Sequence, residues 1–164
     1  MKMHITKEWC LEHKASPDQV VLFLEKWPQG MDVTRESLQT TDFDLAWLIQ
    51  ELAVPISIRA EIDRAKRMAR DKYDSVSMAA YDTEINQVKV VAYTEFSRVI
   101  AADSAKYDQI AAAQMKYDLA VSVAHKKYSR IIDPLWAEFS RAVTAAQIDA
   151  ILHFIGDNRP ASKK

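Results

Sequence analysis

Cys10 and His13 are the residues whose types and spacing most directly suggest chemistry in this sequence. Three positions apart on a helix, they could hold a metal ion, with His4 nearby, or act as a thiol nucleophile beside its base. A structural zinc site normally needs about four ligands, however, and a nucleophile needs a third residue that orients the base. The sequence supplies neither. We therefore expect a buried thiol beside a partly exposed histidine, with no metal, no cofactor and no catalytic residue.

Four Tyr-Asp dipeptides form the most distinctive local pattern. They are Tyr73-Asp74, Tyr81-Asp82, Tyr107-Asp108 and Tyr117-Asp118. In a functional interpretation, they would form a ladder of hydroxyls and carboxylates that faces a ligand. Adjacent residues on a helix point about 100° apart, so each ring can instead lie at the edge of a packed seam while its carboxylate reaches water. We favour this structural interpretation. Acid–base catalysis by paired carboxylates would also need a pocket, which a rod does not supply, and we expect no enzyme.

A basic cluster follows the first third of the chain. Its arginines are Arg59, Arg64, Arg67 and Arg70, with Lys66 and Lys72 between and beyond them. These side chains could contact phosphate groups. Acidic residues at helical spacing, such as Glu61 and Asp71, offer ion-pair partners, so a solvated and salt-bridged face is favoured. Weak nucleic-acid binding stays open as a lesser alternative.

The composition excludes several classes of protein. Of the 164 residues, 49% are hydrophobic and 27% are charged, which is ordinary for a folded protein. The net charge of −1 fits neither a DNA mimic nor a strong nucleic-acid binder. A single cysteine cannot form an internal disulfide, and no apolar run resembles a secretion signal or a membrane span. We expect a cytoplasmic protein, in the host cell cytoplasm if it is phage-encoded.

Residues 1–54 are predicted to form an N-terminal module of short helices. The expected helix starts are Thr6, Ser16 followed by Pro17, Thr34 and Asp42, because Ser, Thr and Asp side chains accept hydrogen bonds from the first free backbone N–H groups of a helix. Pro55 ends the last of these helices. A module this small needs support from the rest of the chain or from a partner.

Residues 55–155 follow a degenerate repeat. Each unit begins with an aromatic residue or Ile and has an aliphatic residue or Ala three positions later, often with Ala again at seven. The first positions are Ile62, Tyr73, Ile85, Phe96, Tyr107, Tyr117, Tyr128 and Phe139, at spacings of 11, 12, 11, 11, 10, 11 and 11 residues. Offsets of 0, 3 and 7 lie on one helix face, so the units build an apolar stripe that barely winds around the helix.

The stripe predicts an all-α chain with long helices. Neither Gly nor Pro occurs from residue 56 to 133, so the chain has few places to turn. One helix cannot bury its own stripe. It either pairs with another chain as a coiled-coil-like rod or folds back as a hairpin near Asp103 and Ser104. We expect Pro134 to kink or end the helix, a C-terminal helix to follow, and residues 156–164 to form a flexible tail.

Aromatic residues are the candidates for partner contacts, because Trp and Tyr dominate the binding energy of many interfaces. Three Trp residues can hardly all be buried in a module of 54 residues, and the rings of the stripe require cover. The candidates are Trp9, Trp27, Trp47, Tyr73, Phe96, Tyr107, Tyr117, Tyr128 and Phe139.

Two stretches carry a resemblance to known proteins. The first runs through Ile5-Thr6-Lys7-Glu8-Trp9-Cys10-Leu11, Asp18-Gln19-Val20, Gly30-Met31-Asp32-Val33-Thr34 and Asp42-Phe43-Asp44-Leu45-Ala46-Trp47-Leu48, and the second is the repeat, as in Ala105-Lys106-Tyr107-Asp108-Gln109-Ile110. Over residues 4–145 the chain resembles small phage and prophage accessory proteins in which a Trp-containing module precedes degenerate Ala-x-Tyr-Asp/Glu-x-Val repeats. That group has no assigned activity, so the resemblance implies a phage-type accessory setting and transfers no functional residue.

The leading hypothesis is a phage-like accessory protein that binds a host or phage protein through its helical surfaces and inhibits or modulates it. The alternative is a structural protein that forms elongated homo-oligomeric coiled coils. Binding to a membrane surface ranks below both, because the stripe is rich in Tyr and Ala and its basic residues are mixed with acidic ones.

Overall fold

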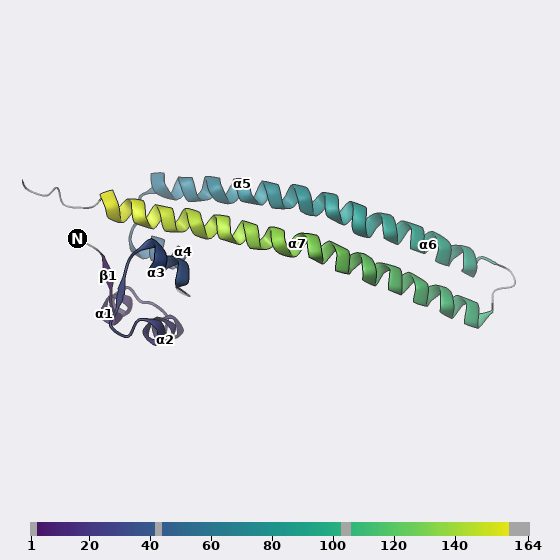
Figure 1. Ribbon diagram of the computed structural model, residues 1–164, viewed down its shortest axis with the longest axis horizontal. Coiled ribbons are helices and arrows are strands. Elements are labelled where there is room, and N and C mark those ends of the chain that lie inside the picture. The colour runs from purple at the N-terminus through teal and green to yellow at the C-terminus, as the bar shows by residue number, and fades with distance from the viewer. Residues whose placement is uncertain (1–2, 42–43, 103–105, 158–164) are drawn as a thin grey trace, which may run out of the picture. The chain divides into compact units, whose positions relative to one another are not determined.

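The computed structural model describes residues 3–41, 44–102 and 106–157 and shows an all-α chain with two very short strands (Figure 1). The elements in chain order are β1 (His4–Ile5), α1 (Lys7–Glu12), α2 (Pro17–Lys26), β2 (Met31–Asp32), α3 (Arg35–Thr40), α4 (Leu45–Glu51), α5 (Ile56–Tyr81), a π-helix (Asp82–Asn86), α6 (Gln87–Ile100) and α7 (Tyr107–Asp157). Of the predicted flexible tail at residues 156–164, Gly156 and Asp157 belong to α7 instead, and the rest lies outside the described residues.

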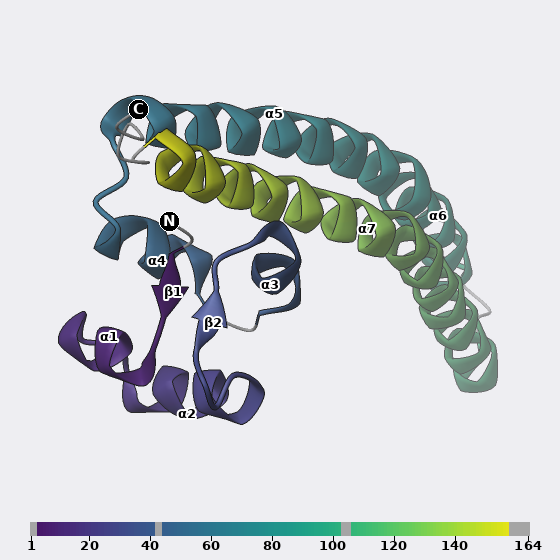
Figure 2. The same ribbon diagram turned by 60° about the vertical axis from the view of Figure 1, so that its left-hand side comes forward.

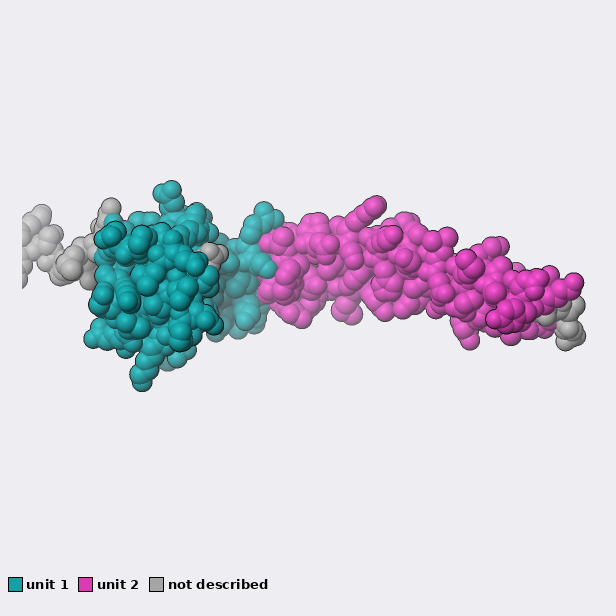
Figure 3. Space-filling view, turned by 90° about the horizontal axis from the view of Figure 1, so that it is seen from below, with its two compact units in different colours: residues 1–68, 140–164 teal, residues 69–139 magenta. Residues whose placement is uncertain are grey.

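The chain forms two compact units, coloured separately in Figure 3. Unit 1 comprises residues 1–68 and 140–164, and unit 2 comprises residues 69–139. Unit 1 thus contains the predicted N-terminal module together with residues from both ends of the repeat region. Unit 2 is the middle of the repeat region.

Side-chain caps begin the short helices of unit 1, as predicted for three of them. The Thr6 hydroxyl accepts from the Trp9 N–H, and the Ser16 hydroxyl from the Gln19 N–H, at 3.2 and 3.3 Å. Thr34 and Ser37 cap α3 reciprocally. These caps satisfy backbone N–H groups that have no partner within the helix.

The predicted cap of α4 is different. Asp42 lies outside the described residues, and Asp44 occupies the N-cap position, where its carboxylate accepts from the N–H groups of Ala46 and Trp47. Asp, Asn, Ser and Thr are all good caps, so a sequence with Asp at two neighbouring positions does not by itself decide between them.

A two-residue antiparallel ladder, which the sequence did not predict, joins the start of the module to the segment after α2 (Figure 2). It pairs His4 with Asp32 and Ile5 with Met31. Ile5 and Met31 are buried, so the ladder places two core side chains between the short helices. Strands this short carry too little alternation to be recognised as strands.

The core of unit 1 is made jointly by the module and the last turns of α7. The buried side chains of the module are Ile5, Cys10, Val20, Phe23, Met31, Val33, Leu38, Leu45, Leu48, Ile49 and Val54. Ile148 and Ile151 of α7 are buried in the same cluster, and Arg35 of α3 pairs with Asp149 on its surface. Side chains of α7 thus supply part of the support that the module was expected to receive from the rest of the chain or from a partner.

Unit 2 is a helical hairpin, one of the two arrangements that the repeat predicted. The end of α5, the π-helix and α6 form one continuous arm, and α7 runs back beside it (Figure 1). The chain reverses between Ile100 and Tyr107, and the predicted new helix start at Asp103 and Ser104 lies outside the described residues. Buried or half-buried repeat residues from both arms, such as Ile85 and Ala124, form the seam of the hairpin.

Pro134 does not end the helix, so of the two outcomes predicted for it, a kink or an end, the end is wrong. α7 continues through it from Tyr107 to Asp157. A proline inside a helix removes one backbone hydrogen bond and costs about 3 kcal/mol. Packing on both sides of it offsets this cost, because Tyr128 and Phe139 each contact α5 across the seam.

Candidate protein-binding surface

Aromatic rings of the repeat contact one another across the hairpin of unit 2. The ring centroids of Phe96 and Tyr117 lie 6.2 Å apart, and those of Tyr81 and Tyr128 lie 5.7 Å apart in an edge-on arrangement. The Tyr128 hydroxyl also hydrogen bonds to the Ser77 hydroxyl at 2.9 Å. Much of the surface of these rings is therefore used inside the chain. Their proposed contact with a partner stays a prediction for the part of each ring that remains at the surface.

A second aromatic group, which we call the Trp136 cluster, consists of Tyr73, Trp136 and Phe139. The Trp136 ring stacks on Phe139 with a centroid distance of 5.2 Å and an interplanar angle of 28°. The Tyr73 ring meets Trp136 edge-on at 5.5 Å and lies 6.3 Å from Phe139. Tyr73 from α5 and the other two rings from α7 thus build one cluster across the seam.

Trp136 is the exposed member of this cluster. Its side chain is 51% exposed, whereas Tyr73 and Phe139 are half-buried. An exposed indole costs free energy in water, and Trp is among the residues that contribute most to protein interfaces. The two rings beneath Trp136 hold it in place, so a partner that covers it loses little side-chain entropy.

Charged side chains border the Trp136 cluster. The Arg70 guanidinium lies 6.0 Å from the Tyr73 ring centroid, and its Nε donates to the Asp74 carboxylate at 2.9 Å. Lys72 of α5 and Glu138 of α7 form an ion pair. Arg70, Lys72 and their acidic partners are about half exposed, so water screens these pairs and each stabilises the fold only weakly. Their main consequence is a polar rim around an apolar centre.

The three Trp residues of the module are packed against the core of unit 1. The rings of Trp9 and Trp47 meet edge-on at 5.8 Å, and Trp27 packs against Phe23 at 5.7 Å. Each of the three is half-buried. The predicted contact of these residues with a partner stays a prediction, and the most exposed indole belongs to Trp136.

Sequence reasoning did not single out Trp136 as a binding residue, because its position falls outside the repeat. It follows Tyr128 by eight residues and precedes Phe139 by three, so it lies beside the stripe instead of on it. This position beside the stripe was the sequence signal that could have identified Trp136 as a candidate binding residue. A large aromatic residue at the edge of a packed stripe is placed to be half covered by the chain and half exposed.

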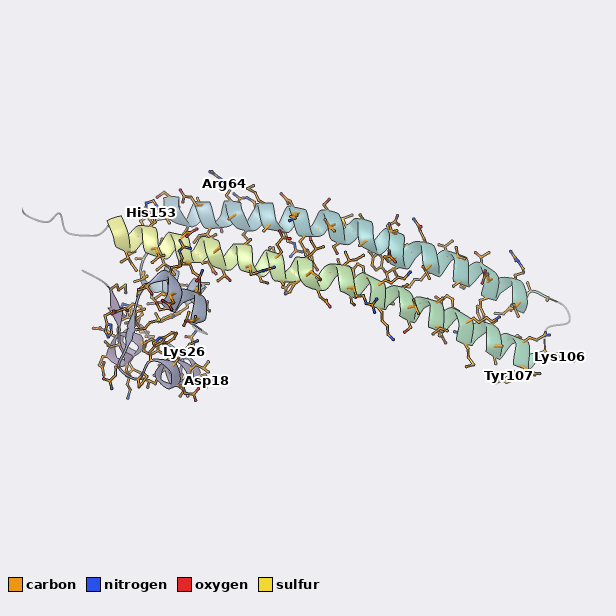
Figure 4. The ribbon with its side chains drawn as sticks, viewed as in Figure 1. Asp18, Lys26, Arg64, Lys106, Tyr107 and His153 are labelled. Carbon is orange, nitrogen blue, oxygen red and sulfur yellow. The ribbon has the colours of Figure 1, made fainter. Side chains whose placement is uncertain are left out.

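Tyr107 is the repeat residue that the structure separates most clearly from the seam. Its side chain is 86% exposed at the start of α7, where Figure 4 labels it beside Lys106. The spacing of ten residues to Tyr117 explains this position. Ten residues of an α-helix leave a rotation of about 80°, whereas eleven leave about 20°, so both rings cannot lie on one seam.

The four predicted basic residues have different surroundings. The Arg59 side chain donates to the Val54 carbonyl at 2.8 Å, and Arg70 is engaged with Tyr73 and Asp74. Arg64 and Arg67 are exposed, and Figure 4 shows Arg64 projecting from α5. Two of the four arginines thus have local structural roles, and contact of this cluster with phosphates stays a prediction.

Cys10 and His13 do not face a common site. Cys10 is fully buried in the core of unit 1, and burial raises the pKa of its thiol, which disfavours the reactive thiolate. The His13 ring instead stacks on Trp9 at 3.9 Å, and its Nδ1 lies 2.9 Å from the Trp9 carbonyl oxygen. Within residues 3–41, 44–102 and 106–157, no three His, Cys, Asp or Glu side chains are placed to hold a metal ion together.

In the part of the chain that the structure describes, no helix combines the length and the apolar character required to cross a membrane. Comparison of the chain with models of known protein families, with curated proteins and with solved structures gives no match.

Proposed function

We propose that this protein is a phage-like accessory protein that binds a host or phage protein through the Trp136 cluster and inhibits or modulates it. The observation that carries the proposal is a half-exposed Trp136 held on Tyr73 and Phe139. The partner class follows from the resemblance of the sequence to phage and prophage accessory proteins.

The chemistry of the cluster fits a protein surface. Trp, Tyr and Arg are the residue types most enriched where interfaces gain their binding energy, and all three occur here within one patch. The ion pairs of Arg70 and Lys72 form a polar rim of the kind that surrounds an apolar interface centre. We infer a partner with an apolar pocket for the indole and with polar groups that match this rim.

The hairpin also changes the alternative hypothesis. The repeat stripe of unit 2 is covered by the opposite arm of the same chain, so a second copy is not needed to bury Ile85 or Ala124. The homo-oligomeric alternative therefore has to use surfaces that the hairpin leaves open. We place binding of the host or phage protein at side chains outside the seam, such as Trp136.

Capture of a partner from host lysate tests the proposal. The wild-type chain, Trp136→Ala and the matched control Met78→Ala are immobilised at equal density, and bound proteins are identified by mass spectrometry. Met78 is 73% exposed on α5 and lies outside the Trp136 cluster, so its truncation removes comparable exposed apolar surface elsewhere. We expect a specific protein to bind the wild type and the control, and its retention to fall about tenfold or more with Trp136→Ala.

Arg70→Ala separates binding from folding, because Arg70 is at the rim and half exposed. It should weaken binding of the same protein while the unfolding midpoint stays close to that of the wild type. The captured protein is then assayed with and without the chain to show inhibition or modulation. Equal capture by the wild type and Trp136→Ala would rule out the cluster as the binding surface.

A further inference from the structure

A groove opens between α6 and α7 in the half of unit 2 that contains the chain reversal. Its volume is about 580 Å³, and we call it the alanine groove because alanines make up much of its wall. They are Ala92, Ala102, Ala112, Ala113 and Ala120. The groove lies away from Tyr73, Trp136 and Phe139, none of which lines it.

The sequence explains why the seam is open here. The Phe96 and Tyr117 rings, 6.2 Å apart, lie between the two helices, while the other apolar residues that line the groove are five alanines and Val99. Large side chains next to small ones leave space that the hairpin itself does not fill. Both rings form part of the groove lining, so the space has an apolar floor.

A ridge of larger apolar side chains runs along the same face of α7. Met115, Leu119 and Val123 follow one another at intervals of four residues, and all three are exposed. Leu119 and Val123 lie three and seven residues after Lys116, which lines the groove, so helix geometry puts them on the side to which the groove opens. On α6, the exposed Val91 precedes the groove residues Glu95 and Arg98 by four and seven positions, so it lies on the same side of that helix as they do.

We propose that the alanine groove is occupied by a second copy of this chain, whose Leu119 ridge enters it. Helices pack by placing ridges at four-residue intervals into grooves on their neighbours. One face of this hairpin carries both the ridge and the groove. A two-fold axis would bury each ridge in the groove of the other copy, so that each contact occurs twice.

The charges of the groove fit the same occupant. Glu95 stands on the α6 wall, and Arg98 and Lys116 stand at the same opening. Under a two-fold axis, Glu95 of one copy meets a basic residue of the other, and the reverse pair forms at the same time. A face with both signs and a small net charge is complementary to itself, whereas a groove of one sign would favour a partner of opposite charge.

Analytical ultracentrifugation of the full-length chain tests this proposal over a wide concentration range. We expect the wild type to change reversibly from 18.7 kDa to twice that mass. Leu119→Glu should raise the dissociation constant at least about tenfold, because it brings a charge into the ridge. Val90→Glu is the matched control. Val90 and Leu119 are each 66% exposed, but Val90 is on the opposite side of α6 from Glu95 and should leave dimerisation unchanged.

A charge exchange identifies the occupant as a second copy. Glu95→Lys should weaken the dimer, Lys116→Glu should weaken it as well, and the double variant should restore it. A wild type that stays monomeric at every concentration would overturn the proposal and leave the groove to a different protein. A dimer that survives Leu119→Glu, or one that Val90→Glu also abolishes, would place the interface elsewhere. Trp136→Ala should not affect dimerisation, so this test and the test of the proposed function can fail independently.

Discussion

Tyr73 and Ile85 both point into the seam of the hairpin although twelve residues separate them. The Tyr73 ring contacts Trp136 and Phe139 of α7, and Ile85 is fully buried. In a regular α-helix twelve residues would rotate Ile85 about 120° away from Tyr73, whereas eleven would leave about 20°. The π-helix at Asp82–Asn86, which contains Ile85, takes up the extra residue and keeps both side chains on one face.

Deletion of Thr83 should therefore be tolerated. Thr83 is an exposed residue of the π-helix, and its loss restores a spacing of eleven between Tyr73 and Ile85. We expect a continuous α-helix and a free energy of unfolding within about 1 kcal/mol of the wild type. Urea unfolding followed by far-ultraviolet circular dichroism measures this change.

Deletion of Ser122 is the matched control. Ser122 is also exposed, but it lies in regular α-helix within α7. Its loss rotates the residues that follow the deletion by about 100° relative to those that precede it. Either Tyr117 or Tyr128 then leaves the seam. We expect a loss of about 3 kcal/mol or more. Equal losses from the two deletions would show that the π-helix does not absorb the twelfth residue.

The two irregular spacings show what the repeat could and could not predict. An average near eleven residues predicted the apolar stripe and the long helices, because these need only a continuous face, but left a paired rod and a hairpin as alternatives. The twelve-residue spacing before Ile85 required a π-helix, whose presence depends on packing across the seam. The ten-residue spacing before Tyr117 has no such compensation, and Tyr107 is left in water.

Exposure of individual aromatic residues depended on contacts that are distant in sequence. The three Trp residues of the module are half covered within unit 1, to which Ile148 and Ile151 of α7 contribute buried side chains. Ile148 and Ile151 are about a hundred residues or more away in sequence from Trp9 and Trp47. No local pattern near either Trp indicates that they complete the core of unit 1. Caps, in contrast, are local, and Thr6, Ser16 and Thr34 were predicted correctly.

Tyr117 and Tyr107 should respond differently to truncation. Tyr117 packs against Phe96 in the seam, so Tyr117→Ala should lower the free energy of unfolding by about 2 kcal/mol. Tyr107→Ala should change it by less than about 0.5 kcal/mol, because that ring is already in water. Urea unfolding of both variants decides the point, and a larger loss from Tyr107→Ala would contradict the seam described for unit 2.

The two glycines of the chain should also differ in how much their replacement by alanine changes the free energy of unfolding. Gly30 has φ of +90°, and a Cβ there would lie 2.4 Å from His4 Nε2 and 2.8 Å from the Ile5 carbonyl oxygen. Gly30→Ala should therefore lower the free energy of unfolding by about 2 kcal/mol or more. Gly156→Ala meets nothing within 4 Å and should change it by at most about 1 kcal/mol. Thermal unfolding of both variants provides the comparison, and a tolerated Gly30→Ala would contradict the close approach of β1.

Ala53 is a position where glycine should stabilise the protein. It follows α4 with φ of +51°, and its N–H donates to the Gln50 carbonyl while the Val54 N–H donates to the Ile49 carbonyl. This arrangement ends a helix in the left-handed region, which costs a residue with a Cβ about 1 kcal/mol. Ala53→Gly should raise the free energy of unfolding by about that amount, whereas Ala60→Gly, on an exposed face of α5, should lower it by a similar amount. Chemical denaturation of both variants tests whether the two substitutions change the free energy of unfolding in opposite directions.

His4 should make the stability of unit 1 dependent on pH. The pKa of His4 is raised above its ordinary value of 6.5, first because of the hydrogen bond of its Nδ1 with the Asp32 carboxylate at 2.7 Å, and then because of that of its Nε2 with the Gln29 carbonyl at 3.2 Å. A raised pKa means that the folded state binds the proton more tightly than the unfolded state. The stabilisation is therefore complete below pH 6.5 and is lost as the pH rises through the higher folded value.

Titration of the His4 ring signal by NMR should give a pKa above 6.5 in the wild type and a lower one in Asp32→Asn, because the amide cannot stabilise the protonated ring as a carboxylate does. The difference in the free energy of unfolding between the two proteins should be largest in mildly acidic solution and should narrow as the pH rises. Asp32 pairs with His4 across β1 and β2, so part of the difference arises from the ladder itself and should persist at high pH. A difference that widens with rising pH would show that the neutral ring, not the protonated one, is favoured at this position.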